Sequence, residues 1–222
     1  MKKTLLVILA LVIVGFGAFA FLTRPVAAPT GNIQSAADAP AATSSAVYRI
    51  SQASSKVEFQ IHETLYGKPK LVIGTTSQIS GDIAVSGSKI DIGTIKIDAR
   101  TLKTDSSSRD GAIDRLILNA GKEGNEYIVF KPTSADLAGA GAPGKQVSFN
   151  VTGDLTISGV TKPATFMVTA TIAGDKISGT ASTTVKRSDY GLKIPSFSFI
   201  ADVGDQFSVS ADIVADKISA AQ

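Results

Sequence analysis

Histidine, cysteine and paired carboxylates build most catalytic and metal-binding sites, and this sequence is poor in the first two. His62 is the only histidine, and the 222 residues include no cysteine. Thiolate metal sites, a cysteine nucleophile and a multi-histidine metal site are therefore excluded within one chain. A Ser-His-Asp triad would depend on His62, which we expect to face solvent, and no G-x-S-x-G elbow accompanies it. We expect no catalytic residue, no metal and no cofactor.

Two pairs of carboxylates are spaced closely enough to share a proton or a hard cation. Asp110 and Asp114 lie one helical turn apart, and Asp202 and Asp205 share a predicted loop. Neither pair belongs to a series with the ligand spacing of a calcium loop. Surface or structural ion pairing is the expected role of these four residues.

Residues 139–144 match the letters of a dinucleotide-binding motif, G-x-G-x-x-G. That motif works where it opens a helix whose N-terminus holds a pyrophosphate. Here the residues after 144 alternate as a strand does, so we expect a flexible loop instead.

Charge is balanced over most of the chain, although the formal net charge is +3. Lys2, Lys3 and Arg24 account for three of the 22 basic residues, and the first 24 residues hold no acidic one, so 19 basic and 19 acidic groups remain. Nucleic-acid binding needs clustered excess Lys and Arg to release counterions from phosphates. We therefore expect no nucleic-acid partner.

Residues 1–24 predict a membrane segment. Residues 4–22 are nineteen residues without a charge, and a helix of that length spans about 28 Å, close to the ~30 Å hydrocarbon core. Lys2 and Lys3 orient it with the N-terminus in the cytoplasm and the rest of the chain exported. The alternative is a signal peptide cleaved at Ala18-Phe19-Ala20, but the apolar run continues past that site. Both interpretations predict an extracytoplasmic body, in the periplasm or cell envelope.

The composition of residues 25–46 predicts a linker, and the alternation pattern of residues 47–219 predicts a single domain. The linker is rich in Ala, Pro, Ser and Thr, with one charge, Asp38, and no aromatic residue, so it cannot bury enough surface to fold. The domain alternates apolar and polar residues with the period of a strand. Its predicted strands are Ser55–Glu63, Gln78–Val85, Thr94–Ala99, Glu126–Ala135, Lys145–Ile157, Ala164–Ala173, Lys176–Arg187 and Gln206–Asp216.

The predicted fold class is all-β with one short helix. Eight consecutive strands joined by turn signals such as Ser158-Gly159 indicate an antiparallel meander, which can close into a barrel. A helix of about three turns interrupts them, capped by Ser108 and ended by Gly121. Its apolar residues at helical spacing are Ala112, Ile113, Leu116 and Ile117.

The interior of the predicted barrel has two possible forms. Large residues lie on different strands, whereas the alternate positions 177–185 form a face of mostly small ones, Ile177, Gly179, Ala181, Thr183 and Val185. Eight strands leave an interior that side chains can just fill, or that holds one slender ligand where some inward residues are small. Spacing alone does not choose between a solid core and an apolar cavity.

Several motifs in order along the domain resemble the YceI-like family of exported bacterial proteins. Residues 151–163, VTGDLTISGVTKP, are similar to the family's G-D-L-T-I-x-G-x-T-x-P hairpin, and residues 186–192, KRSDYGL, to its R-x-D-[FY]-G segment. Supporting segments are Tyr48 to Phe59, Ile79-Ser-Gly-Asp-Ile83, and Thr101 to Asp105 followed by Arg109-Asp110. Two departures are Ala112, where the family's R-D-x-H-L has histidine, and Gly74-Thr75-Thr76, which lacks the aromatic of a G-x-F pattern opening the third strand.

The resemblance implies a lipocalin-like eight-stranded barrel, with a helix alongside, around a long apolar tunnel that binds a polyisoprenoid or other long-chain lipid without catalysis. It also allows a homodimer. The alternative is a structural or adhesion module with a filled core. Combined with the alternation above, the resemblance places the following residues on the tunnel wall or at its cap: Phe59, Ile61, Ile83, Ile97, Phe130, Phe149, Phe166, Ala181, Phe197, Phe199 and Phe207. Arg109, Asp110, Arg187 and Asp189 are expected to form structural ion pairs or to meet the lipid head group.

Overall fold

The structure, a computed structural model, describes residues 46–87, 89–136, 144–194 and 200–218. The predicted leader, nearly all of the linker, most of the glycine-rich loop, Phe197 and Phe199 lie outside these ranges. Within them, no helix has both the length and the apolar character needed to cross a membrane.

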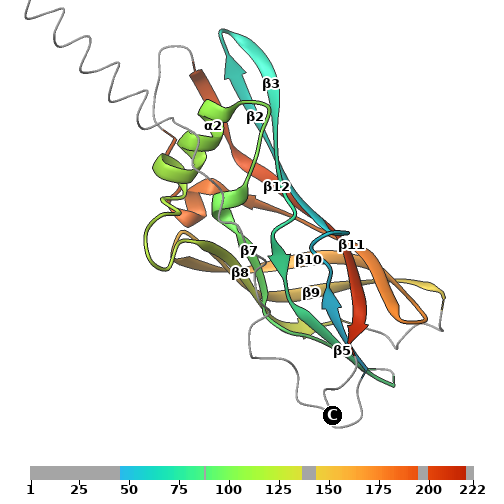
Figure 1. The fold of residues 1–222 in the computed structure, drawn as a ribbon. Helices are drawn as coiled ribbons and strands as arrows, with labels where there is room; N and C mark the ends of the chain where they lie inside the picture. Colours follow the sequence, from blue (N-terminus) through green and yellow to red (C-terminus); the bar gives the residue numbers. More distant parts are fainter. Residues whose placement is uncertain (1–45, 88, 137–143, 195–199, 219–222) are drawn as a thin grey trace, which may run out of the picture.

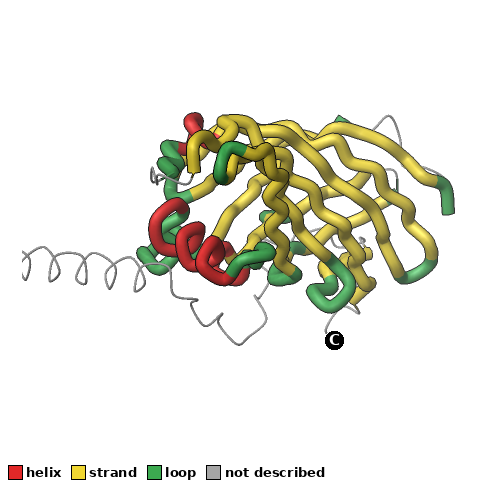
Figure 2. The backbone as a smooth tube through the Cα atoms, turned by 90° about the horizontal axis from the view of Figure 1, so that it is seen from above, coloured by secondary structure: helices red, strands yellow, loops and turns green. Residues whose placement is uncertain are grey.

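The described residues form one curled antiparallel sheet with a short helical segment at one end (Figures 1 and 2). The all-β prediction with one short helix is confirmed. Its strands are β1 Ala46–Ile50, β2 Lys56–Leu65, β3 Lys68–Thr76, β4 Ile79–Ser80, β5 Asp82–Ser86, β6 Lys89–Ile92, β7 Ile95–Asp98, β8 Tyr127–Ala135, β9 Gln146–Ile157, β10 Val160–Ala173, β11 Lys176–Lys186 and β12 Ile200–Ile218. The helical turns are η1 Ala99–Thr101, α2 Ser107–Ala112, η2 Ile113–Ile117 and η3 Arg187–Tyr190.

Twelve strands make up this sheet in the described ranges, where the sequence analysis predicted eight. The run from Gln78 to Val85 divides at Gly81, because β4 pairs with β7 whereas β5 pairs with β1 and β6. A Cβ at Gly81 would lie 2.4 Å from Ile95 Cδ1, so a larger residue there would displace the Ile95 side chain of β7. The strands β1, β3 and β6 fall outside the eight predicted runs. Gly74 to Thr76 end β3 and do not open it.

The sheet is curled: its long last strand pairs with several strands, and the chain passes directly from β3, on a branch beside β2, to β4, at one end of the strand order. β12 pairs with β11 along one edge and with both β1 and β2 along the other. β3 pairs with β2, and only two residues separate it from β4, which pairs with β7 at the far end of the strand order. Paired backbone bonds between Thr75 and Lys103, 2.8 and 2.9 Å long, also tie β3 to the segment after η1.

Tight two-residue turns connect the longest hairpins. Ser158 and Gly159, which the sequence analysis identified as a turn, both have positive φ, 48° and 76°, between β9 and β10. Tyr66 and Gly67 have φ of 50° and 73° between β2 and β3, and this second turn was not predicted. Two successive positive φ values match the twist of the flanking strands, so both turns fix the register of their hairpins.

The helical segment begins earlier and ends earlier than predicted. Ser106 rather than Ser108 is the N-cap, because Ser106 is extended and its Oγ accepts from Arg109 N at 3.4 Å. After α2 the chain widens into the π-helix η2, in which Leu118 N bonds to Ile113 O at 2.8 Å. The wider turn places Leu118, not Leu116, among the residues that face the interior. The segment ends before Gly121.

Asp114, on η2, is a buried carboxylate that predicts a stabilising substitution. It is 8% exposed, and its Oδ1 has no hydrogen-bond partner in the described part of the chain. Burial raises the pKa of Asp114 despite the nearby charges of Arg115, Arg100 and Lys103. The folded state therefore favours the neutral acid and is destabilised when the group ionises.

We expect Asp114→Asn to raise the free energy of unfolding at pH 7 by about 1 kcal/mol. Because the pKa is raised in the folded state, this gain should shrink as the pH falls and vanish below the unfolded carboxyl pKa of about 3.9. Urea unfolding at pH 7 and pH 3 measures both values. A variant less stable than the parent at pH 7 would contradict the prediction.

Candidate binding cavity

A cavity of about 530 Å³ lies inside the curled sheet. Its wall is contributed by the inner faces of most strands and by one side of α2 and η2, and it consists almost wholly of Ile, Leu, Val, Phe and Ala side chains. Within the described ranges, the charged residues of the lining are Glu58, Glu63, Arg109 and Arg187. The sequence left two alternatives open, a solid core and an apolar cavity. The structure has the cavity.

Nine of the eleven residues predicted for the tunnel wall line this cavity: Phe59, Ile61, Ile83, Ile97, Phe130, Phe149, Phe166, Ala181 and Phe207. The other two, Phe197 and Phe199, lie outside the described residues. The rings of Phe130 and Phe166 meet edge to face with centroids 4.8 Å apart, which joins β8 to β10 across the wall. Strand alternation, combined with the family resemblance, identified these positions, because alternation fixes which side chains share one face.

Small residues keep the cavity open. Ile177, Gly179 and Ala181 of β11 belong to the lining, whereas Thr183 and Val185 of the same predicted face do not. On the paired strands β2 and β3, the Phe59 ring lies over Gly74, and a Cβ at Gly74 would be 2.0 Å from that ring. The glycine thus gives Phe59 room against the wall.

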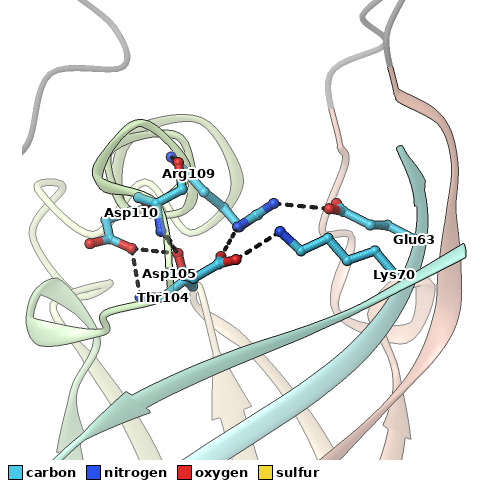
Figure 3. Close-up of polar contacts among 7 residues, drawn as sticks. Glu63, Lys70, Thr104, Asp105, Arg109 and Asp110 are labelled. Atoms are coloured by element: carbon cyan, nitrogen blue, oxygen red, sulfur yellow. Dashed lines mark hydrogen bonds and ion pairs between the residues drawn. The ribbon is translucent and has the colours of Figure 1, made fainter. Parts of the chain in front are cut away.

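Glu63 places a carboxylate on this otherwise apolar inner face. It follows Val57, Phe59 and Ile61 at every second position of β2, and its side chain is 6% exposed. Arg109 Nη2 donates to Glu63 Oε1 at 2.9 Å (Figure 3). The sequence analysis did not select Glu63. The available signal was that Glu63 continues the every-second-residue series of Val57, Phe59 and Ile61.

Arg109 and Lys70 extend this contact into a four-residue network between α2 and the β2–β3 hairpin. The other terminal nitrogen of Arg109, Nη1, donates to Asp105 Oδ1, and Lys70 Nζ donates to Asp105 Oδ2 at 2.7 Å (Figure 3). The hydrogen bond from Lys70, with the charge of Arg109, lowers the pKa of Asp105. The network therefore ties the helix to the hairpin at one end of the cavity.

Asp110 does not pair with Arg109, its neighbour in the sequence. Its Oδ1 accepts from Thr104 N at 2.7 Å and from Thr104 Oγ1 at 2.8 Å, and Lys103 Nζ is 3.8 Å from Oδ2. Adjacent residues of a helix point in different directions, so the two side chains separate. Asp110 holds the loop before α2, whereas Arg109 reaches the cavity.

Arg187, expected to form a structural ion pair or to meet the head group, binds backbone carbonyls. It donates to the backbone carbonyls of Gly204 at 3.1 Å, Leu192 at 3.2 Å and Val203 at 3.4 Å. Asp189 is exposed, and neighbouring Ser188 instead contacts Asp205 through N and Oγ, at 3.0 and 2.8 Å. These bonds hold η3 against β12, which is a structural role.

The remaining candidate chemistry is dispersed. His62 is exposed on the outer face of β2, as expected, and Asp205 is engaged by Ser188. In the ranges that the structure describes, no three His, Cys, Asp or Glu side chains gather closely enough to hold a metal ion. The cavity and its polar end are thus the candidate site.

Solved structures share this fold. A polyisoprenoid binding domain from Saccharophagus degradans implicated in plant cell wall breakdown has a TM-score of 0.64 and 15% identity, over 77% of this chain and 98% of that one. BcnA of Burkholderia cenocepacia has a TM-score of 0.57 and 19% identity, over 74% and 98% of the two chains. The YceI protein of Campylobacter jejuni has a TM-score of 0.54 and 16% identity, over 66% and 85%. At these identities the likeness concerns the fold.

Sequence comparison identifies the family. No curated protein matches the chain in sequence. The model of the YceI-like domain matches residues 48–215, which is most of the sheet from β1 to β12. On this match, the chain belongs to the YceI-like family.

Proposed function

We propose that this protein binds a polyisoprenoid or another long-chain lipid in the cavity of its curled sheet, as a carrier or buffer without a catalytic step. The observation that carries the proposal is the wall, in which apolar side chains surround about 530 Å³. Each buried methylene of a lipid tail contributes about 0.8 kcal/mol, so such a wall binds a chain without directed polar contacts. The polyisoprenoid binding domain of similar fold supports this ligand class.

The alternative, a structural module with a filled core, agrees less well with this interior. Packed protein cores leave few voids larger than a water molecule. A cavity of about 530 Å³ far exceeds that size, and lining it with apolar groups forgoes packing contacts that a scaffold would use. A space kept open in this way favours a ligand.

We further propose that the domain works outside the cytoplasm, tethered to the membrane. The uncharged residues 4–22 behind Lys2 and Lys3, and the linker at residues 25–46, support this arrangement. A tether would keep the cavity near the bilayer in which long-chain lipids dissolve.

Extraction of the purified domain tests the lipid proposal. Residues 46–222 are used because they contain the whole of the family match, residues 48–215. The domain, expressed in its host, should release a long-chain lipid into organic solvent, detectable by mass spectrometry. A domain that emerges empty and also takes up no isoprenoid when incubated with one would refute the proposal.

A further inference from the structure

The buried Glu63–Arg109 pair is not needed for binding an apolar tail. Taking a carboxylate out of water is costly unless a cation and hydrogen bonds compensate. Glu63, with a side chain 6% exposed, has that compensation from Arg109 at 2.9 Å. An apolar residue at position 63 would continue the series Val57, Phe59, Ile61 without this cost. A charged pair in this position therefore requires a separate explanation.

The pair lies at one end of the cavity, together with most of its other polar lining. Glu63 is near the end of β2, and Ser106, Ser108 and Arg109 belong to the cap and first turn of α2. Ile50, Ile83 and Ile213 belong to the apolar lining, and β5, which carries Ile83, lies at the end of the sheet away from α2 (Figure 1). An amphiphile in this cavity would place its tail among the isoleucines and its head beside Glu63 and Arg109.

The charges of the four-residue network cancel, and Arg187, the other cation of the lining, is bonded to the backbone carbonyls of Gly204, Leu192 and Val203. Arg109 and Lys70 contribute two positive charges, and Glu63 and Asp105 contribute two negative ones. Arg109 has five N–H groups, of which two bind these carboxylates; the structure records no acceptor for the other three among the residues it describes. The network therefore offers hydrogen-bond donors without excess positive charge of its own.

A head group that reaches the free N–H groups of Arg109 must also approach the carboxylate of Glu63. A hydroxyl or carbonyl oxygen can do so without repulsion. A phosphate or diphosphate would bring like charges together in a partly desolvated site, where their repulsion is poorly screened. On this geometry the pair would favour one class of head group and disfavour the other.

We infer that the Glu63–Arg109 pair selects the lipid by the charge of its head group, accepting uncharged oxygen-bearing heads and rejecting phosphates. In this pair Glu63 determines specificity, and Arg109 donates the hydrogen bonds. The inference rests on the proposed lipid-binding function and specifies its ligand class.

Two probes with the same tail test this selection: geranylgeraniol, an alcohol, and geranylgeranyl diphosphate. Their affinities for residues 46–222 are measured by displacement of N-phenyl-1-naphthylamine, an uncharged apolar fluorophore. The parent domain should prefer the alcohol at least about tenfold. Glu63→Gln keeps the length and an acceptor for Arg109 but removes the negative charge, so the preference for the alcohol should fall at least about tenfold.

Three variants serve as controls. Glu123→Gln removes the same charge from an exposed loop residue outside the cavity wall and should leave the ratio unchanged. The double variant Glu63→Gln with Arg109→Gln removes the cation as well and should restore the preference for the alcohol. Ser108→Lys adds a positive charge at an exposed residue of the lining, so it tests the selection even if Glu63→Gln fails to fold.

The outcomes separate the two proposals. A ratio that stays constant in both Glu63→Gln and Ser108→Lys, while both probes bind, overturns the selection and leaves lipid binding standing. A parent domain that binds neither probe overturns both. A ratio that shifts toward the diphosphate in these variants, but not in Glu123→Gln, supports the selection.

Discussion

Replacing Ala181 with tryptophan should weaken lipid binding about 50-fold and leave the sheet folded. Ala181 is half-buried on the inner face of β11, between Val168 of β10 and Ala211 of β12, and lines the cavity. An indole ring there would occupy space that a lipid tail needs. If it displaces about three methylene units at about 0.8 kcal/mol each, the loss is about 2.4 kcal/mol, or about 50-fold in affinity.

The matched control is Thr184→Trp, which places the same ring on the exposed outer face of the same strand. Displacement of N-phenyl-1-naphthylamine by geranylgeraniol reports the affinity, and circular dichroism during heating reports the fold. Thr184→Trp should bind like the parent. Equal affinity of Ala181→Trp and the parent would show that the lipid does not occupy this cavity.

Gly153→Val should destabilise the domain by about 3 kcal/mol, the upper part of the range for overpacking. Gly153 lies in β9 between Pro132 of β8 and Ala164 of β10. A Cβ there would be 2.3 Å from the carbonyl oxygen of Lys131 and 2.8 Å from Pro132 Cα. These are backbone atoms, so relief requires β8 and β9 to separate. This close approach also gives a physical reason for the glycine in the G-D-L-T-I segment.

Thermal unfolding measures this effect. For a domain of this size about 1 kcal/mol corresponds to roughly 2–4 °C, so we expect the midpoint to fall by about 10 °C. Gly121→Ala is the control, because a Cβ at Gly121 meets no atom within 4 Å and this glycine has no positive φ. A Gly153→Val midpoint within the scatter of Gly121→Ala would contradict the argument.

The strands that the sequence located best are those with long, regular alternation. The predicted run Lys145–Ile157 agrees with β9, Gln146–Ile157, and Lys176–Arg187 agrees with β11, Lys176–Lys186. Alternation is a property of neighbouring residues, because successive side chains of any strand point to opposite faces. Predictions that depended on contacts between distant residues were less accurate. The predicted strand Gln78–Val85 divides at Gly81 because the strand partner changes there. The π-helix after α2 depends on how that segment packs over the cavity.

The family resemblance and the alternation together located most of the candidate site. They identified the apolar wall from Phe59 to Phe207 and named Arg109 as a structural or head-group residue. They did not specify the partner of Arg109, and its adjacent carboxylate, Asp110, points toward Thr104. The actual partner, Glu63, is 46 residues away.

The sequence by itself determined which side chains share a face, since that depends only on the two-residue period of a strand. It thereby placed Glu63 on the same side of β2 as Phe59 and Ile61. Only the tertiary structure decided that this face encloses a cavity and that Glu63 meets Arg109 at its end. Both depend on how far the sheet curls and where α2 packs, and these are set by contacts between strands distant in the chain.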